Sequence, residues 1–389
     1  MATTFQPACP HYRKCGGCQM QNLPYAEQLL WKQRLCDRLL RPYGKPMPIL
    51  GMENPLHYRN KVQAAFGVNH KKQIISGVYQ SSSHRIVPID HCMIEDACAD
   101  AIIVTIRSML PSFKILPYQE DSGYGLLRHV LVKRGFTSGE VMVVLVTASP
   151  VFPSRNNFVK ALRNAHPEIT TILQNINPGH TSLVLGEQEK ILYGPGYIED
   201  TLCGCTFRIS AKSFYQINPV QTEVLYRTAV SFAGLTGKET VVDAYCGIGT
   251  IGLIASRHAK SVIGVELNRD AVRDAISNAR RMNIRNARFY PGDAGEFLCA
   301  MAEAGERADV VFLDPPRAGS SNAFLNALRT LLPNRIVYIS CNPETLARDL
   351  AVLAKDPYRV TAIQPVDMFP FTHHVECVVL LSKADGFST

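Results

Sequence analysis

The sequence has no long hydrophobic run, and this absence excludes several classes of protein. No stretch of the 389 residues approaches the ~18 consecutive apolar residues that a membrane-spanning helix needs. The N-terminus, with Cys9, Pro10 and His11 so early, lacks the apolar core of a signal peptide. Internal repeats and low-complexity stretches are absent as well. We therefore expect a soluble, cytoplasmic globular protein that does not enter a membrane.

Acidic residues are scarce only in the first third of the chain. Residues 1–135 hold 17 Lys and Arg against 9 Asp and Glu, whereas the remainder holds 24 basic and 24 acidic residues. The N-terminal third therefore carries the whole net charge of +8. A basic surface suits a polyanion such as RNA, although solvated lysines on an ordinary soluble protein explain the charge equally well.

The spacing of apolar residues divides the chain into four segments. A polar, cysteine-bearing segment (1–22) precedes a helical pattern over Leu23–Leu40, within a segment (23–50) that we expect to pack on the C-terminal domain. Alternating β-branched residues, including a hairpin of 131–134 with 141–146, predict a β-rich central domain (51–205). Strands alternate with helices in the last segment (206–389), which is typical of a doubly wound α/β domain. The strands expected there are Thr240–Ala244, Ser261–Glu266, Arg288–Pro291, Asp309–Leu313, Arg335–Ser340, Tyr358–Pro365 and Glu376–Leu381.

Acidic residues follow the first three strands of this α/β domain. The first strand runs into the glycine-rich segment Asp243–Gly252, the second ends at Glu266, and Asp293 follows the third. Glycines let the backbone approach a ligand, and an acidic residue after the second strand can bind ribose hydroxyls. Several carboxylates suit a cationic cofactor better than an anionic pyrophosphate. These residues predict a site for S-adenosylmethionine.

Two other interpretations of the same residues stay open. The spacing Gly247-x-Gly249-x-x-Gly252 matches the dinucleotide fingerprint, which would make the protein a nicotinamide oxidoreductase. Alternatively, the three acidic residues merely cap the helices that follow them.

A cysteine follows the fifth expected strand, in Ser340-Cys341-Asn342-Pro343. Immediately before a helix, the sulfur of Cys341 would lie near the positive end of the helix dipole, which favours the thiolate. Cys341 is therefore a candidate nucleophile, although a lone cysteine is more often part of the packing.

Five motifs, in order along the chain, resemble the uridine-C5 RNA methyltransferase family. The resemblance is to its 23S rRNA uracil-5-methyltransferase type, which contains an iron–sulfur cluster, and it covers nearly the whole chain. It implies a Rossmann-like methyltransferase domain that uses S-adenosylmethionine, with the cluster held by the β-rich central domain. The motifs are Phe214-x-Gln216-x-Asn218, Asp243–Gly249, Asp314-Pro-Pro-Arg317, Ser340-Cys-Asn-Pro343 and Asp367-Met-Phe-Pro-x-Thr-x-His374-x-Glu376.

The resemblance implies a role for individual residues. Cys341 would attack C6 of the uracil, and Glu376 would accept the proton from C5 before elimination. Phe214 would stack on the flipped uridine and Arg128 would contact RNA. Thr250 departs from the asparagine of some relatives. The cofactor contacts implied are Gln216, Tyr245, Thr250, Glu266, Asp293 and Asp314.

Three N-terminal cysteines have the spacing of a metal site. Cys9-x5-Cys15-Gly-Gly-Cys18 supplies three thiolates, and the fourth ligand is Cys92 or Cys98. The resemblance implies Cys92 and a 4Fe–4S cluster with a structural, RNA-facing role. Zinc is the alternative, because thiolate spacing distinguishes the two metals poorly.

The implied partner is RNA, with ribosomal RNA preferred and a T-loop uridine of tRNA as the alternative. Many relatives carry a small β-barrel RNA-binding domain before the cluster. Since only eight residues precede Cys9, we expect that domain to be absent here. We expect the basic first third of the chain to bind RNA instead. We expect a monomer without an obligate protein partner. A non-catalytic, metal-dependent RNA-binding protein is the remaining rival.

Overall fold

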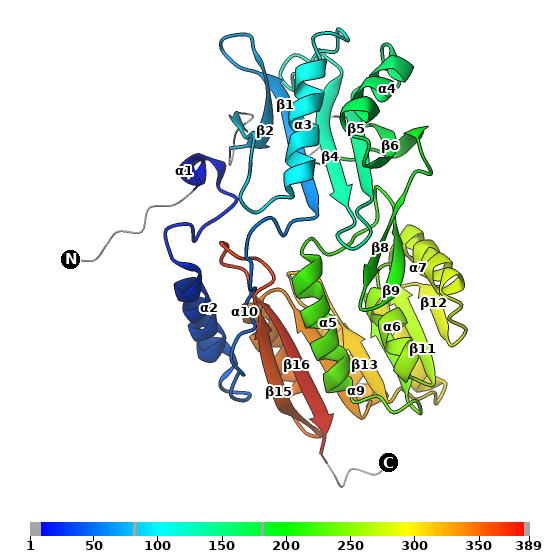
Figure 1. Cartoon of the computed structure of the whole chain (residues 1–389). Coiled ribbons are helices and arrows are strands. Elements are labelled where there is room, and N and C mark those ends of the chain that lie inside the picture. Colours follow the sequence, from blue (N-terminus) through cyan, green and yellow to red (C-terminus); the bar gives the residue numbers. More distant parts are fainter. Residues whose placement is uncertain (1–8, 81–82, 84, 180–182, 385–389) are drawn as a thin grey trace, which may run out of the picture.

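A mixed seven-stranded sheet forms the upper half of the protein in Figure 1, a computed structural model that describes residues 9–80, 83, 85–179 and 183–384. The strand order is β3-β2-β1-β4-β5-β6-β7, and only β5 and β6 run parallel. The expected hairpin is confirmed as β4 and β5. The strands are β1 Lys61–Val68, β2 Ile74–Tyr79, β3 Ile86–Pro88, β4 Leu127–Arg134, β5 Val141–Thr147, β6 Ile169–Ile176 and β7 Gln188–Tyr193.

A second seven-stranded sheet forms the lower half, in the order β12-β11-β10-β13-β14-β16-β15. The first five strands of that order are parallel, and β16 is antiparallel to both of its neighbours. All seven strands expected from the sequence are present within two residues of their expected ends. They are β10 Thr240–Ala244, β11 Ser261–Glu266, β12 Ala287–Pro291, β13 Val310–Leu313, β14 Arg335–Ser340, β15 Tyr358–Val366 and β16 Glu376–Lys383.

Helices cover both faces of the second sheet, because its strands are apolar on both sides. Val241 of β10 points into one core with α5, α6 and α7, and the next residue, Val242, points into another with α2, α8, α9 and α10. In the described part of the chain, no helix has the length and apolar character needed to cross a bilayer. These helices are α2 Tyr25–Leu40, α5 Pro219–Ala233, α6 Thr250–Ala255, α7 Arg269–Arg281, α8 Ala294–Glu303, α9 Asn322–Leu331 and α10 Pro343–Leu353; α1 is Tyr12–Cys15, and a short 3-10 turn spans Ser256–His258.

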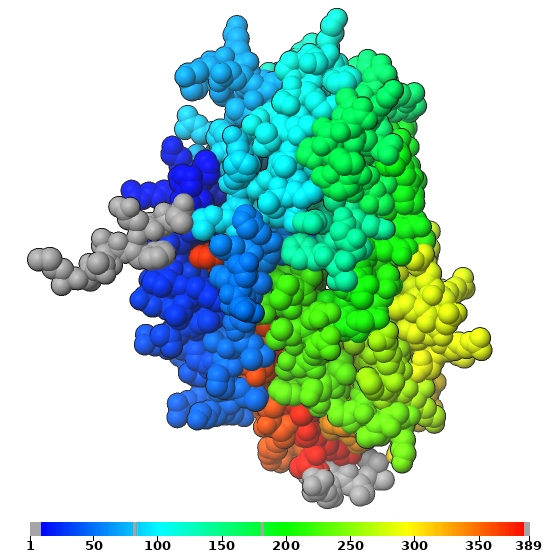
Figure 2. All heavy atoms as spheres, in the orientation of Figure 1, coloured from blue at the N-terminus to red at the C-terminus, as the bar shows by residue number. Residues whose placement is uncertain are grey.

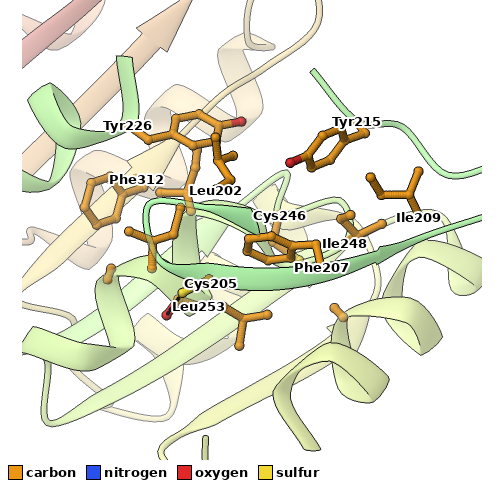
Figure 3. Packing of buried hydrophobic residues seen from close by; sticks show 14 of the residues in the cluster. Leu202, Cys205, Phe207, Ile209, Tyr215, Tyr226, Cys246, Ile248, Leu253 and Phe312 are labelled. Carbon is orange, nitrogen blue, oxygen red and sulfur yellow. Dashed lines mark hydrogen bonds between the residues drawn. The ribbon is translucent and has the colours of Figure 1, made fainter. Parts of the chain in front are cut away.

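One of the hydrophobic cores is shared by the two halves. Helices α3 (Ala97–Met109) and α4 (Arg155–Ala165) pack on one face of the first sheet. Side chains of its other face, such as Val144, join the core of the second sheet through the hairpin β8 (Ile198–Leu202) and β9 (Cys205–Ile209). Figure 3 shows Phe207 of β9 beside Cys246 and Ile248 of the loop after β10. The boundary expected between residues 205 and 206 therefore falls inside a hairpin that joins the two halves.

Helix α2 buries a face that contains polar as well as apolar side chains. Leu30 lies on the surface, whereas Gln28, Lys32, Cys36 and Leu40, spaced four residues apart, are buried. Apolar periodicity could not predict this face, because two of its four residues are polar and are stabilised by partners elsewhere in the chain. These partners belong to the loop between β15 and β16.

Candidate active site

The loop after β10 is held by the carboxylate of Asp243. Its Oδ2 accepts a hydrogen bond from the backbone N–H of Gly252 at 2.7 Å, while its Oδ1 is buried without a hydrogen-bond partner. A Cβ on Gly252 would lie 2.8 Å from Oδ2, so glycine is required there. Asp243 thus fixes the turn into α6 and leaves one buried acceptor for a ligand.

Glu266 and Asp293 organise the loops next to this turn. Glu266 accepts hydrogen bonds from the backbone N–H groups of Gly247, at 3.1 Å, and Asn268, at 2.8 Å. Asp293 caps α8 by accepting from the backbone N–H groups of residues 295 and 296. The capping interpretation is therefore correct for Asp293, and it does not exclude ligand binding because both side chains also line a cavity.

A cavity of about 420 Å³ opens at the carboxyl ends of β10, β11, β12 and β13. Ligands bind at this edge in open α/β sheets. Two further lining residues, Tyr226 and Leu267, were not expected from the sequence; Tyr226 lies on α5, outside the glycine-rich loop. The cavity includes five of the six expected cofactor contacts and an expected substrate contact: Tyr245, Thr250, Glu266, Asp293, Asp314 and Phe214.

Gln216, the sixth expected cofactor contact, lies beside this cavity and does not line it. Its side chain forms a hydrogen bond with Tyr226, and its backbone carbonyl accepts a hydrogen bond from Asn60 at 3.0 Å. Gln216 therefore orients a cavity residue.

Burial changes the acid–base behaviour of two carboxyl groups here. It raises the pKa of Asp243 to about 7, with smaller contributions from the charges of Asp314 and Glu266. Burial alone raises the pKa of Asp314 to about 7. Near neutral pH these groups are only partly ionised, and a bound cation would favour their charged form.

Cys341 and Glu376 are brought together by strand pairing. Cys341 directly follows β14, and Glu376 begins the antiparallel neighbour β16, with Ser340 opposite Cys377. Asp314 follows β13, the neighbour of β14 on the other side. The three side chains therefore meet at one edge of the sheet, next to the cavity. The expected helix after Cys341 is α10.

The Cys341 thiol is less acidic than its place before a helix indicates. Its pKa is raised to about 11, mainly by burial and then by the charges of Glu376 and Asp314, against a lowering by Arg317. The pKa of Glu376 is also raised well above its ordinary value, mainly by burial and secondly by the charge of Asp314. The sequence could not predict this, because the opposing charges come from other strands.

The loop that leads to Glu376 is fixed by buried hydrogen bonds to distant segments. The ammonium of Lys32 lies 2.6 Å from Asp367, and the hydroxyl of Tyr25 donates to the same carboxylate at 2.9 Å. The side chain of Gln28 accepts a hydrogen bond from the backbone N–H of Phe371. Helix α2 is therefore part of the support of the candidate active site.

The four expected metal ligands, Cys9, Cys15, Cys18 and Cys92, line a single cavity of about 390 Å³. Cys98 does not line it; it lies on α3 with its sulfur 3.4 Å from Glu168. Among the described residues, no three His, Cys, Asp or Glu side chains converge closely enough to hold a single metal ion. The number and type of these side chains, four thiols, match the ligands of an iron–sulfur cluster or a zinc ion.

The two expected RNA contacts differ in accessibility. Phe214 is 67% exposed at the mouth of the larger cavity, where a base could stack on it. Arg128 is buried, paired with Glu120 at 2.8 Å, and donates to the backbone carbonyls of Asn177 and Gly179. Its donors are occupied inside the protein, and the expected contact between Arg128 and RNA stays a prediction.

Comparison with known proteins agrees with this geometry. The family described as tRNA (uracil-5-)-methyltransferase matches residues 24–384. An uncharacterized RNA methyltransferase of Halalkalibacterium halodurans is 44% identical over 96% of this chain and 82% of its own, and one of Clostridium acetobutylicum is 42% identical over 98% and 84%. The crystal structure of a tRNA (uracil-54, C5)-methyltransferase of Pyrococcus abyssi with S-adenosyl-L-homocysteine has a TM-score of 0.78 at 28% identity, covering 94% of this chain and 86% of that chain. The chain therefore belongs to the tRNA (uracil-5-)-methyltransferase family, whose members are RNA methyltransferases.

Proposed function

We propose that this protein methylates C5 of a uridine in RNA through a covalent bond between Cys341 and C6 of the base. The observation that carries the proposal is the meeting of Cys341 and Glu376 at the ends of paired strands, beside a cavity rich in carboxylates. A nucleophile next to a buried carboxyl group is the arrangement that addition and elimination at a uracil ring require.

The reaction follows from what each side chain can do. S-adenosylmethionine, when bound, supplies an electrophilic methyl group. The thiolate of Cys341 adds to C6 of uracil, which makes C5 nucleophilic enough to take the methyl group, and S-adenosylhomocysteine is left as the second product. Glu376 then accepts the proton from C5, and the bond between sulfur and C6 breaks to release 5-methyluridine and the Cys341 thiolate. Burial raises the pKa of Glu376, so the ionised carboxylate is a stronger base for this proton than an ordinary glutamate.

Residues of the larger cavity would bind the methyl donor. Glu266, at the end of β11, would accept hydrogen bonds from the ribose hydroxyls. Tyr245, Thr250 and Asp293 line the same cavity. Asp314 lies between this cavity and Cys341, where its charge would favour a sulfonium. Gln216 would orient Tyr226 through their side-chain hydrogen bond. The exposed ring of Phe214 would stack on the flipped uridine.

The cysteine cavity would hold a 4Fe–4S cluster, with zinc as the alternative. Its four thiols supply the full ligand set of such a cluster. Cys18 and Cys92 also pack with Phe371, a residue of the loop that leads to Glu376. A cluster there would stabilise this loop and the RNA-facing surface, and the thiolate chemistry needs no electron from it.

The RNA would be 23S rRNA or tRNA. The resemblance to enzymes of 23S rRNA favours the first, and the likeness to the Pyrococcus abyssi enzyme favours a T-loop uridine of tRNA. The test is incubation with labelled S-adenosylmethionine and total RNA from a strain lacking the gene, followed by mapping of the label. Label in 5-methyluridine of one of these RNAs is expected with the natural protein and not with Cys341→Ala. Absence of labelled 5-methyluridine would refute the proposal.

A further inference from the structure

The only tryptophan of the chain stacks on a histidine of the loop that leads to Glu376. Trp31 lies on α2 and is 38% exposed, and its ring centroid is 5.0 Å from that of His373, with the ring planes 26° apart. His373 is exposed as well. Figure 2 shows a small orange-red area from this part of the chain surfacing among the blue N-terminal segments. The pair presents aromatic surface to solvent.

The stack is built on a fixed base. Lys32, the residue after Trp31, donates to Asp367 at 2.6 Å and to the backbone carbonyl of Phe369 at 3.0 Å. One helical turn earlier, Gln28 accepts from the backbone N–H of Phe371. These buried bonds hold the helix and the loop at a set distance, so little conformational entropy is lost when a further ring packs against the pair.

The histidine of the stack lies close in sequence to Glu376 of the candidate active site. His374 follows His373, and Glu376 lies two residues further on. Burial lowers the pKa of His374, and the positive charge of Arg317 lowers it further; the same guanidinium also lowers that of Cys341 against the effect of burial. The guanidinium of Arg317 therefore lies within electrostatic range of both His374, next to the stack, and Cys341.

The charge around Trp31 suits a nucleic acid. Arg34 and Arg38 are exposed and lie three and seven residues after Trp31, which places them on the same side of α2. Glu27, four residues before Trp31, is also exposed on this side, so the balance is two positive charges to one negative. In proteins that bind single-stranded RNA, guanidinium groups bind the phosphates and neighbouring aromatic rings stack on the bases.

We propose that Trp31 and His373 form a stacking platform for an unpaired nucleotide of the RNA substrate, adjacent to the uridine that is methylated. This inference rests on the proposed function and adds the residues that hold the strand outside the catalytic centre. Arg34 and Arg38 would bind the phosphates on either side of the stacked base.

The single tryptophan makes the test direct, because intrinsic emission reports this position alone. Titration of the full-length protein with a single-stranded oligouridylate is expected to quench the emission in step with binding measured by anisotropy of a labelled oligonucleotide. Trp31→Ala should raise the dissociation constant roughly 5- to 150-fold, since stacking of one base contributes about 1–3 kcal/mol. Trp31→Phe should recover most of the loss, because a ring is restored.

Two controls separate this inference from the proposed function. Leu30→Ala changes an exposed neighbour on the same helix and should leave RNA affinity unchanged. Binding of S-adenosylmethionine should be the same in Trp31→Ala as in the natural protein. Unchanged emission at saturating oligouridylate, or equal RNA affinity of Trp31→Ala and the natural protein, would overturn the platform even if 5-methyluridine is formed. Failure to form 5-methyluridine while the platform variants still weaken RNA binding would overturn the proposed reaction alone.

Discussion

The ammonium of Lys32 on α2 lies 2.6 Å from the carboxylate of Asp367, and neither side chain is exposed to solvent. These residues are 335 positions apart, and the pair joins the N-terminal helix to the loop that leads to Glu376. A buried carboxylate needs such a partner, because desolvation of an unpaired charge is costly. The contact therefore couples folding of the N-terminal segment to the geometry of the candidate active site.

Lys32→Met should destabilise the protein by about 3–5 kcal/mol, because the charge of Asp367 stays buried without its partner. Urea unfolding followed by circular dichroism measures the loss. Lys45→Met removes an exposed lysine and should change stability by less than about 0.5 kcal/mol. The double variant Lys32→Met/Asp367→Asn should recover part of the loss, since no charge remains buried. A loss below about 1 kcal/mol in Lys32→Met would contradict the assigned role.

Binding of S-adenosylmethionine near pH 7 should release more protons than binding of S-adenosylhomocysteine. Burial raises the pKa of Asp314 to about 7, and a sulfonium beside it lowers that pKa, so a carboxyl group that is partly protonated gives up its proton. The neutral thioether of the product has no such effect. Calorimetric titration in buffers of different ionisation enthalpy counts the protons.

Asp314→Asn should shrink this difference between the two ligands, whereas Glu303→Gln, an exposed carboxylate at the end of α8, should leave it unchanged. Equal proton release with both ligands in the natural protein would show that no titrating carboxyl group faces the sulfonium.

Alkylation of Cys341 by iodoacetamide should accelerate about tenfold for each pH unit from 7 to 10, because its pKa is raised to about 11 and only the thiolate reacts. Glu376→Gln removes a charge that raises this pKa, so the profile should move to lower pH. Peptide mass spectrometry follows the labelling. The exposed Cys299 is an internal control whose profile should be the same in both proteins. A rate at Cys341 that is already constant above pH 8 would contradict the raised pKa.

Cys92→Ser should lower the iron and sulfide content of the anaerobically purified protein, because Cys92 lines the cavity with the other three expected ligands. Cys98→Ser is the matched control, since its thiol lies on α3 beside Glu168, and it should keep the metal content of the natural protein. Full iron content in Cys92→Ser would remove this residue from the ligand set, and zinc in place of iron would favour the alternative metal.

The sequence was sufficient for the features that local pattern determines. All seven strands of the second sheet follow from short apolar runs, and the positions of Asp243, Glu266 and Cys341 follow from the rule that ligands bind at the carboxyl ends of strands. Asp293, which lines the larger cavity, was predicted for the same reason, whereas Phe214, Tyr245, Thr250 and Asp314 were implied by the resemblance to a known family. The resemblance to a known family supplied Glu376.

Features that depend on distant partners were not predictable. The buried face of α2 contains Lys32, whose partner Asp367 is far away in the sequence, so apolar spacing could not indicate that this residue is buried. The raised pKa of Cys341 depends on carboxylates from other strands. The burial of Arg128 depends on Glu120 and on backbone carbonyls of a later segment. In each case a polar contact between separate elements decided the outcome.

Glu376→Gln offers the most direct test of the proposed reaction. Without the carboxylate, methyl transfer leaves an adduct that cannot lose its C5 proton, so the protein should stay bonded to RNA after denaturation. Mass spectrometry after protease and nuclease digestion should find 5-methyluridine monophosphate on the peptide that contains Cys341, and none when Cys341→Ala is combined with Glu376→Gln. Normal turnover by Glu376→Gln without an adduct, or an adduct at another residue, would contradict the account.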